Sequence, residues 1–215
     1  MTDGYPVMLN LAGRTCVVIG GGETAARKIS GLLEAGAAVT LISPEIVPAI
    51  QQMLGSIHWE PQPYTPGQIM NLRPVLVFAA TDDPITNQQI VQEARSVGAF
   101  VNSVDGTAES DFTNMAVVRR HPLTIGIHTG GAAPGLAKHL KAKIAEAVGE
   151  EYVILARWLD NLRPNARNQL DTQAQRQQLY EAIIVSDVLP LLRQGQMGSA
   201  YYEFQSIVRA CGVTL

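Results

Sequence analysis

Three small residues in the first quarter of the chain have the spacing of a phosphate-binding turn: Gly20, Gly22 and Ala25 form a G-x-G-x-x-A pattern. In such a turn the first glycine allows the bend, the second lets the backbone approach a pyrophosphate, and the third small residue lets helix and strand pack closely. The N–H groups at the start of the helix, around Glu23 and Thr24, would then face the phosphates. We therefore predict a dinucleotide site here, the alternative being a tight turn without a ligand.

Ser43, Pro44 and Glu45 follow the next apolar run, where a dinucleotide-binding fold usually carries an acidic residue for the adenosine ribose. Ser43 could donate to a ribose hydroxyl, and Glu45 is close enough in sequence to help. This stretch contains no Arg or Lys that would bind a 2′-phosphate, and Glu45 would repel one. The segment favours NAD over NADP, although an ordinary strand exit and helix cap would have the same pattern.

Thr81, Asp82 and Asp83 follow a third long apolar run, at the strand end where ligands of open α/β sheets bind. Thr81 is the expected neighbour of the cofactor, because a neutral hydroxyl does not repel a pyrophosphate. Asp82 and Asp83 have two interpretations, a contact with the cofactor or a cap for the next helix.

Asp105 comes directly after another predicted strand, at the same edge of the sheet. A carboxylate beside a nicotinamide ring can accept a substrate proton while hydride leaves to the cofactor. Asp105-Gly106 is also a common turn-forming pair, so the residues alone leave both interpretations open.

These candidates require a frame of alternating strands and helices. Short apolar runs predict strands at 15–19, 38–42, 75–80 and 100–104, with an exposed or edge strand at 57–60. Helical periodicity follows the glycine turn to Gly36, and predicts further helices at 46–54 and 85–98. Short connections between such elements predict a Rossmann-type fold, a doubly wound parallel α/β sheet covered on both faces.

Beyond Asp105 the pattern changes to a hairpin at 115–127, a basic amphipathic helix at 135–148 and helices at 152–162, 172–184, 188–193 and 200–210. We therefore predict three parts: a Rossmann domain at 1–112, a small sheet-plus-helix module at 113–149 and a helical domain at 150–215.

The composition excludes several classes of function. With 47% hydrophobic residues and a formal net charge of −3, the chain is globular and too acidic for a general nucleic-acid binder. No stretch is apolar for the roughly 18 residues that a membrane span needs, and the first residues lack the basic region of a signal peptide. Cys16 and Cys211 lack metal-ligand spacing. We expect a cytoplasmic protein without membrane or nucleic-acid partners.

Several motifs together resemble one family, that of precorrin-2 dehydrogenase, the N-terminal type of sirohaem synthase. They lie in order at 10–13, 20–28, 33–37, 79–83, 101–105 and 129–134, and the resemblance continues through the helical tail. It implies an oxidoreductase of sirohaem and porphyrin biosynthesis that converts precorrin-2 to sirohydrochlorin with NAD. It also implies a homodimer built largely by the middle module. Asp105 matches the aspartate proposed as catalytic in the family.

This chain departs from the family pattern at two places. Gly106 stands where a second acidic residue is common, and His128-Thr129 precedes the paired glycines where serine is frequent. Neither change touches Asp105. Some members also insert iron into sirohydrochlorin; this ferrochelatase activity stays open, since the four histidines form no recognisable metal motif.

A tetrapyrrole with many carboxylates would need cationic and polar contacts. The predicted substrate-binding residues are Asn102, Arg119, Arg120, His128, Thr129 and Lys138. A solvated hairpin tip and helix face would explain the basic residues equally well. Two other functions remain open: an NAD(H)-sensing regulatory subunit without catalysis, and methyl transfer from S-adenosylmethionine, whose enzymes share glycine-rich first turns.

Overall fold

The computed structural model describes residues 4–106 and 109–215 of the chain. It divides into two compact units, Met1–Asn114 and Met115–Leu215. The first unit holds the predicted Rossmann domain. The further boundary expected between residues 149 and 150 falls inside the second unit and stays a prediction.

The first unit contains a five-stranded sheet in the order β3-β2-β1-β4-β5, in which every strand pair is parallel. Its strands are β1 (Thr15–Ile19), β2 (Ala38–Ile42), β3 (His58–Glu60), β4 (Leu76–Ala79) and β5 (Phe100–Ser103). Val18 in the central strand β1 pairs with Leu41 of β2 on one side and Phe78 of β4 on the other. The predicted parallel sheet is confirmed, with β3 as the expected edge strand.

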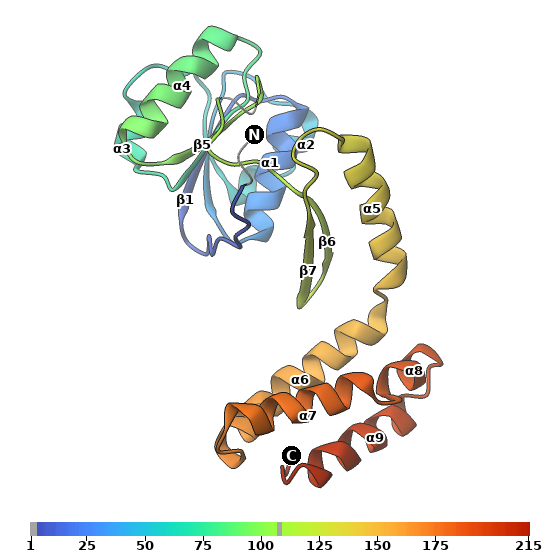
Figure 1. Ribbon diagram of the computed structural model, residues 1–215. Helices are drawn as coiled ribbons and strands as arrows, with labels where there is room; N and C mark the ends of the chain where they lie inside the picture. The colour runs from blue at the N-terminus through green and yellow to red at the C-terminus, as the bar shows by residue number, and fades with distance from the viewer. Residues whose placement is uncertain (1–3, 107–108) are drawn as a thin grey trace. The chain divides into compact units, whose positions relative to one another are not determined.

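Helices cover both faces of this sheet because its strands are apolar on both faces. Cys16 and Val18 pack in one core cluster with Ile29 of helix α1 (Glu23–Glu34). Val17 and Ile19 point to the opposite face and pack with residues of helix α4 (Pro84–Ser96). Figure 1 shows α1 and α4 on opposite sides of the strands. The sheet is therefore doubly wound, as expected.

Short elements in the first unit differ from the sequence expectation. The helix predicted at 46–54 is reduced to α2 (Pro48–Gln51) and a 3₁₀ turn at Leu54–Ser56. Helix α3 (Gln68–Leu72) was not predicted, because it has five residues and buries only Ile69, so no apolar stripe marks it.

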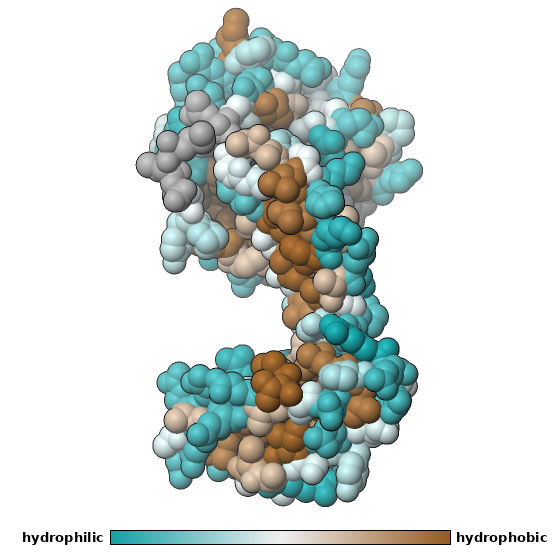
Figure 2. Space-filling view, turned by 45° about the vertical axis from the view of Figure 1, so that its right-hand side comes forward, coloured by the Kyte–Doolittle hydropathy of each residue, from teal (hydrophilic) through white to brown (hydrophobic). Residues whose placement is uncertain are grey.

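The second unit begins with the predicted antiparallel hairpin, β6 (Ala116–Arg120) and β7 (Leu123–Ile127). Helix α5 (Pro134–Ala147) packs against both strands, yet none of its residues is buried. Leu136 is 51% exposed and Leu140 36% exposed. Figure 2 shows a band of apolar surface along the part of the molecule that α5 occupies. Among the described residues of the second unit, none buries this apolar face of α5.

Four helices complete the second unit: α6 (Glu150–Gln169), α7 (Gln173–Val185), α8 (Val188–Arg193) and α9 (Met197–Ala210). They share one core, which includes the fully buried Leu162, Leu179 and Phe204. Helix α6 continues past its predicted end and contains Pro164. Leu162 and Ala166 on either side of this proline are both fully buried, so tertiary packing outweighs the cost of a proline in the helix. Within the described residues, no helix is both long and apolar enough to cross a membrane.

Candidate functional site

The glycine turn joins β1 to α1 and has no room for side chains at its first two positions. Gly20 has a φ of +115°, and a Cβ on it would lie 2.1 Å from the carbonyl oxygen of Ala80 after β4. A Cβ on Gly21 would lie 1.8 Å from the carbonyl oxygen of Glu45. Gly21 was not singled out from the sequence, although it lets the turn touch the segment after β2. The two glycines therefore bring the ends of three strands together.

The third glycine faces open space. Gly22 is the N-cap of α1, and no side chain caps this helix end. Apart from the adjoining chain, no described atom lies within 4 Å of the position of a Cβ on Gly22. Glu23 and Thr24 open the helix, and the Thr24 hydroxyl accepts a hydrogen bond from Arg27 Nη2 at 3.0 Å. Ala25 is fully buried where α1 packs on the sheet. Each small residue thus has the place that a phosphate-binding turn requires.

A cavity of about 670 Å³ lies at this turn, along the carboxyl ends of the strands. It is lined by the glycine turn, the segments after β2 and β4, and two residues beyond β3: Ile19, Gly20, Gly21, Gly22, Ile42, Ser43, Pro44, Glu45, Ile46, Val47, Pro63, Tyr64, Ala80, Thr81, Asp82, Asp83 and Thr86. No Lys, Arg or His is among these lining residues. Positive charge for an anion therefore comes here from the helix N-terminus and the N–H groups of the turn rather than from these side chains.

Ser43 is buried and holds the wall of the cavity together. Its hydroxyl donates to the carbonyl oxygen of Glu45 at 2.6 Å, and its own carbonyl accepts from Trp59 Nε1 at 2.9 Å. Val47 N donates to Gly21 O at 2.9 Å, which fastens the same segment to the glycine turn. The hydroxyl proton that was expected to reach a ribose is thus used inside the protein. A ribose contact by Ser43 stays a prediction, as it does for Pro44 and for the exposed Glu45.

Asp83 caps helix α4. Its carboxylate accepts from the backbone N–H groups of Ile85 at 3.2 Å and Thr86 at 3.0 Å. Hydrogen bonds from the side chain and backbone of Thr86 hold the pKa of Asp83 below its usual value. The capping interpretation is therefore confirmed for Asp83. Both aspartates line the cavity, and Asp82 stays a predicted cofactor contact.

Thr81 and Asp105 are joined by a residue that sequence reasoning missed. Asn87 of α4 is only 1% exposed. Its Oδ1 accepts from the Thr81 hydroxyl at 2.8 Å, and its Nδ2 donates to Asp105 Oδ2 at 2.8 Å. Asp105 itself is exposed and does not line the cavity. The predicted catalytic carboxylate is thus connected through one buried amide to a residue of the cavity wall.

Ser110 and Asp111, which follow Asp105 in the chain, form hydrogen bonds with strand β5. Ser110 Oγ accepts from Ser103 N at 2.9 Å and donates to Gly106 O at 2.9 Å. Asp111 accepts from Val101 N at 3.0 Å and forms an ion pair with Arg95 at 2.8 Å. These contacts attach Ser110 and Asp111 to strand β5, close to the strand end that leads to Asp105.

Asn102 has a structural role on the face of the sheet that α1 covers. Its Oδ1 accepts from Lys28 Nζ at 3.2 Å, and its Nδ2 donates to the carbonyl oxygen of Phe112 at 3.0 Å. Burial, together with the charge of Arg27, lowers the pKa of Lys28. The amide that was predicted to bind substrate therefore holds neighbouring chain segments, and a substrate contact stays a prediction.

The other predicted substrate residues belong to the second unit. Arg120 donates to the carbonyl oxygen of Ala145 at 2.9 Å and pairs with Glu150 at 3.4 Å. Thr129 donates to the carbonyl oxygen of Ala133 at 3.2 Å. Arg119, His128 and Lys138 are exposed. The Arg120 guanidinium thus binds a backbone carbonyl near the end of α5. Substrate contacts by all five of these residues stay predictions.

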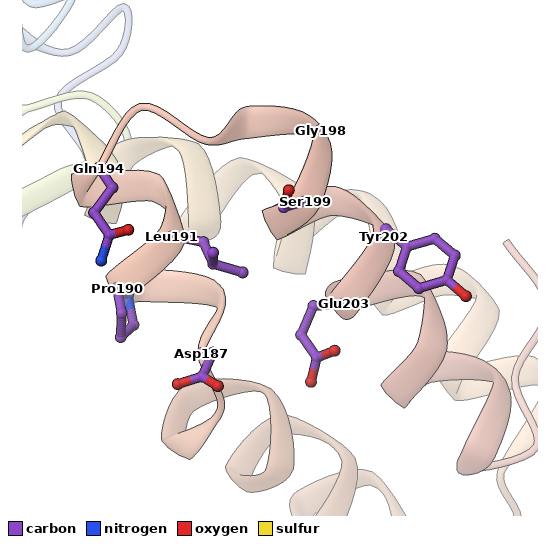
Figure 3. A pocket seen from close by; sticks show the side chains of 8 residues that line it. All are labelled: Asp187, Pro190, Leu191, Gln194, Gly198, Ser199, Tyr202 and Glu203. Atoms are coloured by element: carbon purple, nitrogen blue, oxygen red, sulfur yellow. The ribbon is translucent and has the colours of Figure 1, made fainter.

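A second cavity, of about 560 Å³, lies in the helical part of the second unit. Figure 3 shows Asp187, Leu191 and Glu203 around it, with Leu191 pointing into the hollow between α8 and α9. None of the site residues predicted from the sequence is among the described residues that line this cavity. Across residues 4–106 and 109–215, no group of three or more His, Cys, Asp or Glu side chains is placed to hold a metal ion.

Comparisons with known proteins found sequence relatives and a solved structure of similar fold. A siroheme synthase of Methylobacillus flagellatus is 33% identical over 96% of this chain, and one of Chromobacterium violaceum is 29% identical over 97%. The chain spans only 44% of the length of each of these relatives. A solved structure titled SirC, precorrin-2 dehydrogenase, matches the fold with a TM-score of 0.73 and 24% identity, covering 96% of this chain and 100% of that one.

These matches confirm the resemblance that the sequence motifs indicate. The family model described as putative NAD(P)-binding matches residues 7–116, which contain the glycine turn, the cavity and Asp105. Because that match covers just over half of the chain, this protein belongs to the putative NAD(P)-binding family.

Proposed function

We propose that this chain is an NAD-dependent dehydrogenase that converts precorrin-2 to sirohydrochlorin in sirohaem biosynthesis. The observation that carries the proposal is the cavity at the glycine turn, whose wall is connected through Asn87 to the carboxylate of Asp105. The relatives named siroheme synthase and the fold of the dehydrogenase support this choice of substrate.

The residues at the turn fit a dinucleotide. Gly22 leaves open space beside an uncapped helix N-terminus, so a pyrophosphate can approach the backbone there and accept hydrogen bonds from the backbone N–H groups. The bound nicotinamide supplies a hydride acceptor. In the usual arrangement of the fold the adenosine lies over the end of β2, so the nicotinamide end extends towards Thr81 and β5.

Asp105 performs the proton step in this proposal. Loss of two hydrogens from precorrin-2 releases one as hydride to the cofactor and one as a proton. An exposed carboxylate at the end of β5 is accessible to a bound tetrapyrrole and can accept that proton.

NAD is the proposed cofactor rather than NADP. Glu45 lines the cavity beyond β2, and no cationic side chain lines it. A 2′-phosphate placed there would meet a carboxylate without a compensating Arg or Lys.

We propose a homodimer that covers the apolar face of α5 with a second copy. Support comes from Leu136 and Leu140, which lie exposed on a helix without buried residues. We also propose the cytoplasm as the compartment, since Cys16 and Cys211 are both free thiols. Light scattering of the purified protein tests the dimer, and Leu140→Asp should yield monomers.

Turnover tests the function. Purified protein given precorrin-2 and NAD without oxygen should form NADH and sirohydrochlorin in equal amounts. Asp105→Ala should lower kcat by about 100- to 10,000-fold while NAD affinity stays unchanged. Asp171→Asn, an exposed aspartate between α6 and α7, is the matched control and should leave both values unchanged. Tight NAD binding without any turnover by the wild-type protein would point to the regulatory alternative.

A further inference from the structure

Asn87 uses every hydrogen-bonding position of its side-chain amide. Oδ1 accepts from Thr81 N at 3.1 Å and from Thr81 Oγ1 at 2.8 Å. Nδ2 donates to Thr81 O at 3.0 Å and to Asp105 Oδ2 at 2.8 Å. A primary amide has two donor hydrogens and two acceptor lone pairs, so the set is complete. In a side chain that is 1% exposed, an incomplete set would be costly.

The backbone of Thr81 determines which end of the amide faces Asp105. A backbone N–H can only donate and a carbonyl oxygen can only accept, so Oδ1 must lie towards Thr81 N and Nδ2 towards Thr81 O. Nδ2 is therefore the atom directed at Asp105, and the carboxylate receives a hydrogen-bond donor there. An aspartate at position 87 would place an acceptor at the same point.

We propose that Asn87 is the positioning residue for Asp105: its buried amide holds the carboxylate as a hydrogen-bond acceptor at a fixed place beside the dinucleotide cavity. This inference rests on the proposed function, because Asp105 must act on substrate for its position to matter. Thr81 connects the two, since it lines the cavity and binds the same amide. The position of the Asp105 carboxylate thus depends on Asn87 and Thr81, which lie at the cofactor cavity.

Asn87→Asp is the sharpest test, because the substitution keeps the size of the side chain. The carboxylate can still accept from Thr81 N and Thr81 Oγ1, but both Nδ2 hydrogen bonds are lost and a second acceptor faces Asp105. We expect kcat to fall by about 10- to 100-fold, because a displaced or protonated carboxylate no longer accepts the substrate proton in place. Gln88→Glu makes the same amide-to-acid change at an exposed neighbour on α4 and should leave kcat unchanged.

A double-mutant cycle distinguishes a positioning role of Asn87 from a purely structural one. If Asn87 acts through Asp105, Asn87→Asp should leave the residual kcat of Asp105→Ala unchanged. If Asn87 only supports the fold, the same substitution should lower kcat in both backgrounds by a similar factor. Asn87→Ser provides a second, smaller variant should the aspartate variant fold poorly, and the same pattern is expected for it. Circular dichroism and thermal melting of each variant report whether it is folded.

Each outcome decides between the inference and the proposed function. A wild-type protein that does not oxidise precorrin-2 overturns both. An active wild type whose kcat is unchanged by both Asn87→Asp and Asn87→Ser overturns the inference alone. An equal fall in both backgrounds also overturns the positioning role and leaves the dehydrogenase intact. A fall that is confined to the background with an intact Asp105 supports the inference.

Discussion

The substitution Gly22→Ala should change the affinity for the cofactor much more than the stability of the fold. Gly22 has extended backbone angles that alanine readily adopts, and apart from the adjoining chain no described atom lies within 4 Å of the new methyl group. The cost to the free energy of unfolding is therefore limited to about 0.5–1 kcal/mol, for a less favourable N-cap. If NAD binds as proposed, the methyl group enters the space through which its pyrophosphate approaches the backbone. Loss of one charge-assisted hydrogen bond there, worth about 1.5–3 kcal/mol, should raise the Kd for NAD about ten- to a hundredfold.

Calorimetric titration with NAD, together with thermal unfolding, measures both effects. Gly31→Ala is the matched control on the same helix: it also has open space around its Cβ and should stabilise the protein by about 0.5–1 kcal/mol without changing the Kd. If Gly22→Ala binds NAD with wild-type affinity, the pyrophosphate does not approach this backbone, and the reasoning about the turn is refuted.

Four other predictions concern single side chains. Gly21→Ala should lower the free energy of unfolding by about 2–4 kcal/mol in chemical denaturation, because its Cβ overlaps the Glu45 carbonyl and breaks the bond to Val47 N. Glu45→Arg should improve NADP affinity about tenfold relative to NAD in fluorescence titrations, since it replaces a repelling charge with an attracting one. Burial raises the pKa of Glu93, but hydrogen bonds from Tyr64 and from backbone N–H groups outweigh burial, so the net pKa is lowered. The ionised Glu93 therefore stabilises the folded protein above its usual pKa of 4.5, and this stabilisation is lost as the pH falls through the lower pKa of the folded state. Melting temperatures should then show Glu93→Gln less stable than wild type at neutral pH, with the difference shrinking below pH 4.5. Burial also raises the pKa of Cys16 to about 11, so alkylation followed by mass spectrometry should find this thiol unreacted at neutral pH until the protein unfolds.

The sheet could be predicted because its signals are local. The runs around Val18, Leu41 and Val77 are continuous and apolar, and each ends at glycine, serine or threonine close to the observed strand end. The change from strand to helix after Gly22 is equally visible in the sequence. Where the core contact is small, as for α3, the sequence carries no periodic signal, and where packing overrides a proline, as at Pro164, it misplaces the helix end.

The candidate site was predictable in its motifs but not in its contacts. Gly20 and Gly22, chosen from their spacing, and Thr81, chosen from its place after a strand, all line one cavity. Asn87 was missed because it stands in a run of polar residues, 86–89, in which nothing marks one as buried, and its partner Asp105 is 18 positions away. The roles of Ser43 and Asn102 as internal hydrogen-bond partners were also out of reach, since they depend on which segments the fold brings together.

A crystal structure of the protein with NAD bound tests the central claim most directly. The account predicts the pyrophosphate at the backbone of Gly22 and Glu23, the adenosine beside Glu45, and the nicotinamide ring on the side of Thr81 and Asp105. A cofactor bound elsewhere, or one whose nicotinamide lies at the Glu45 end with the ring turned away from Asp105, would contradict it.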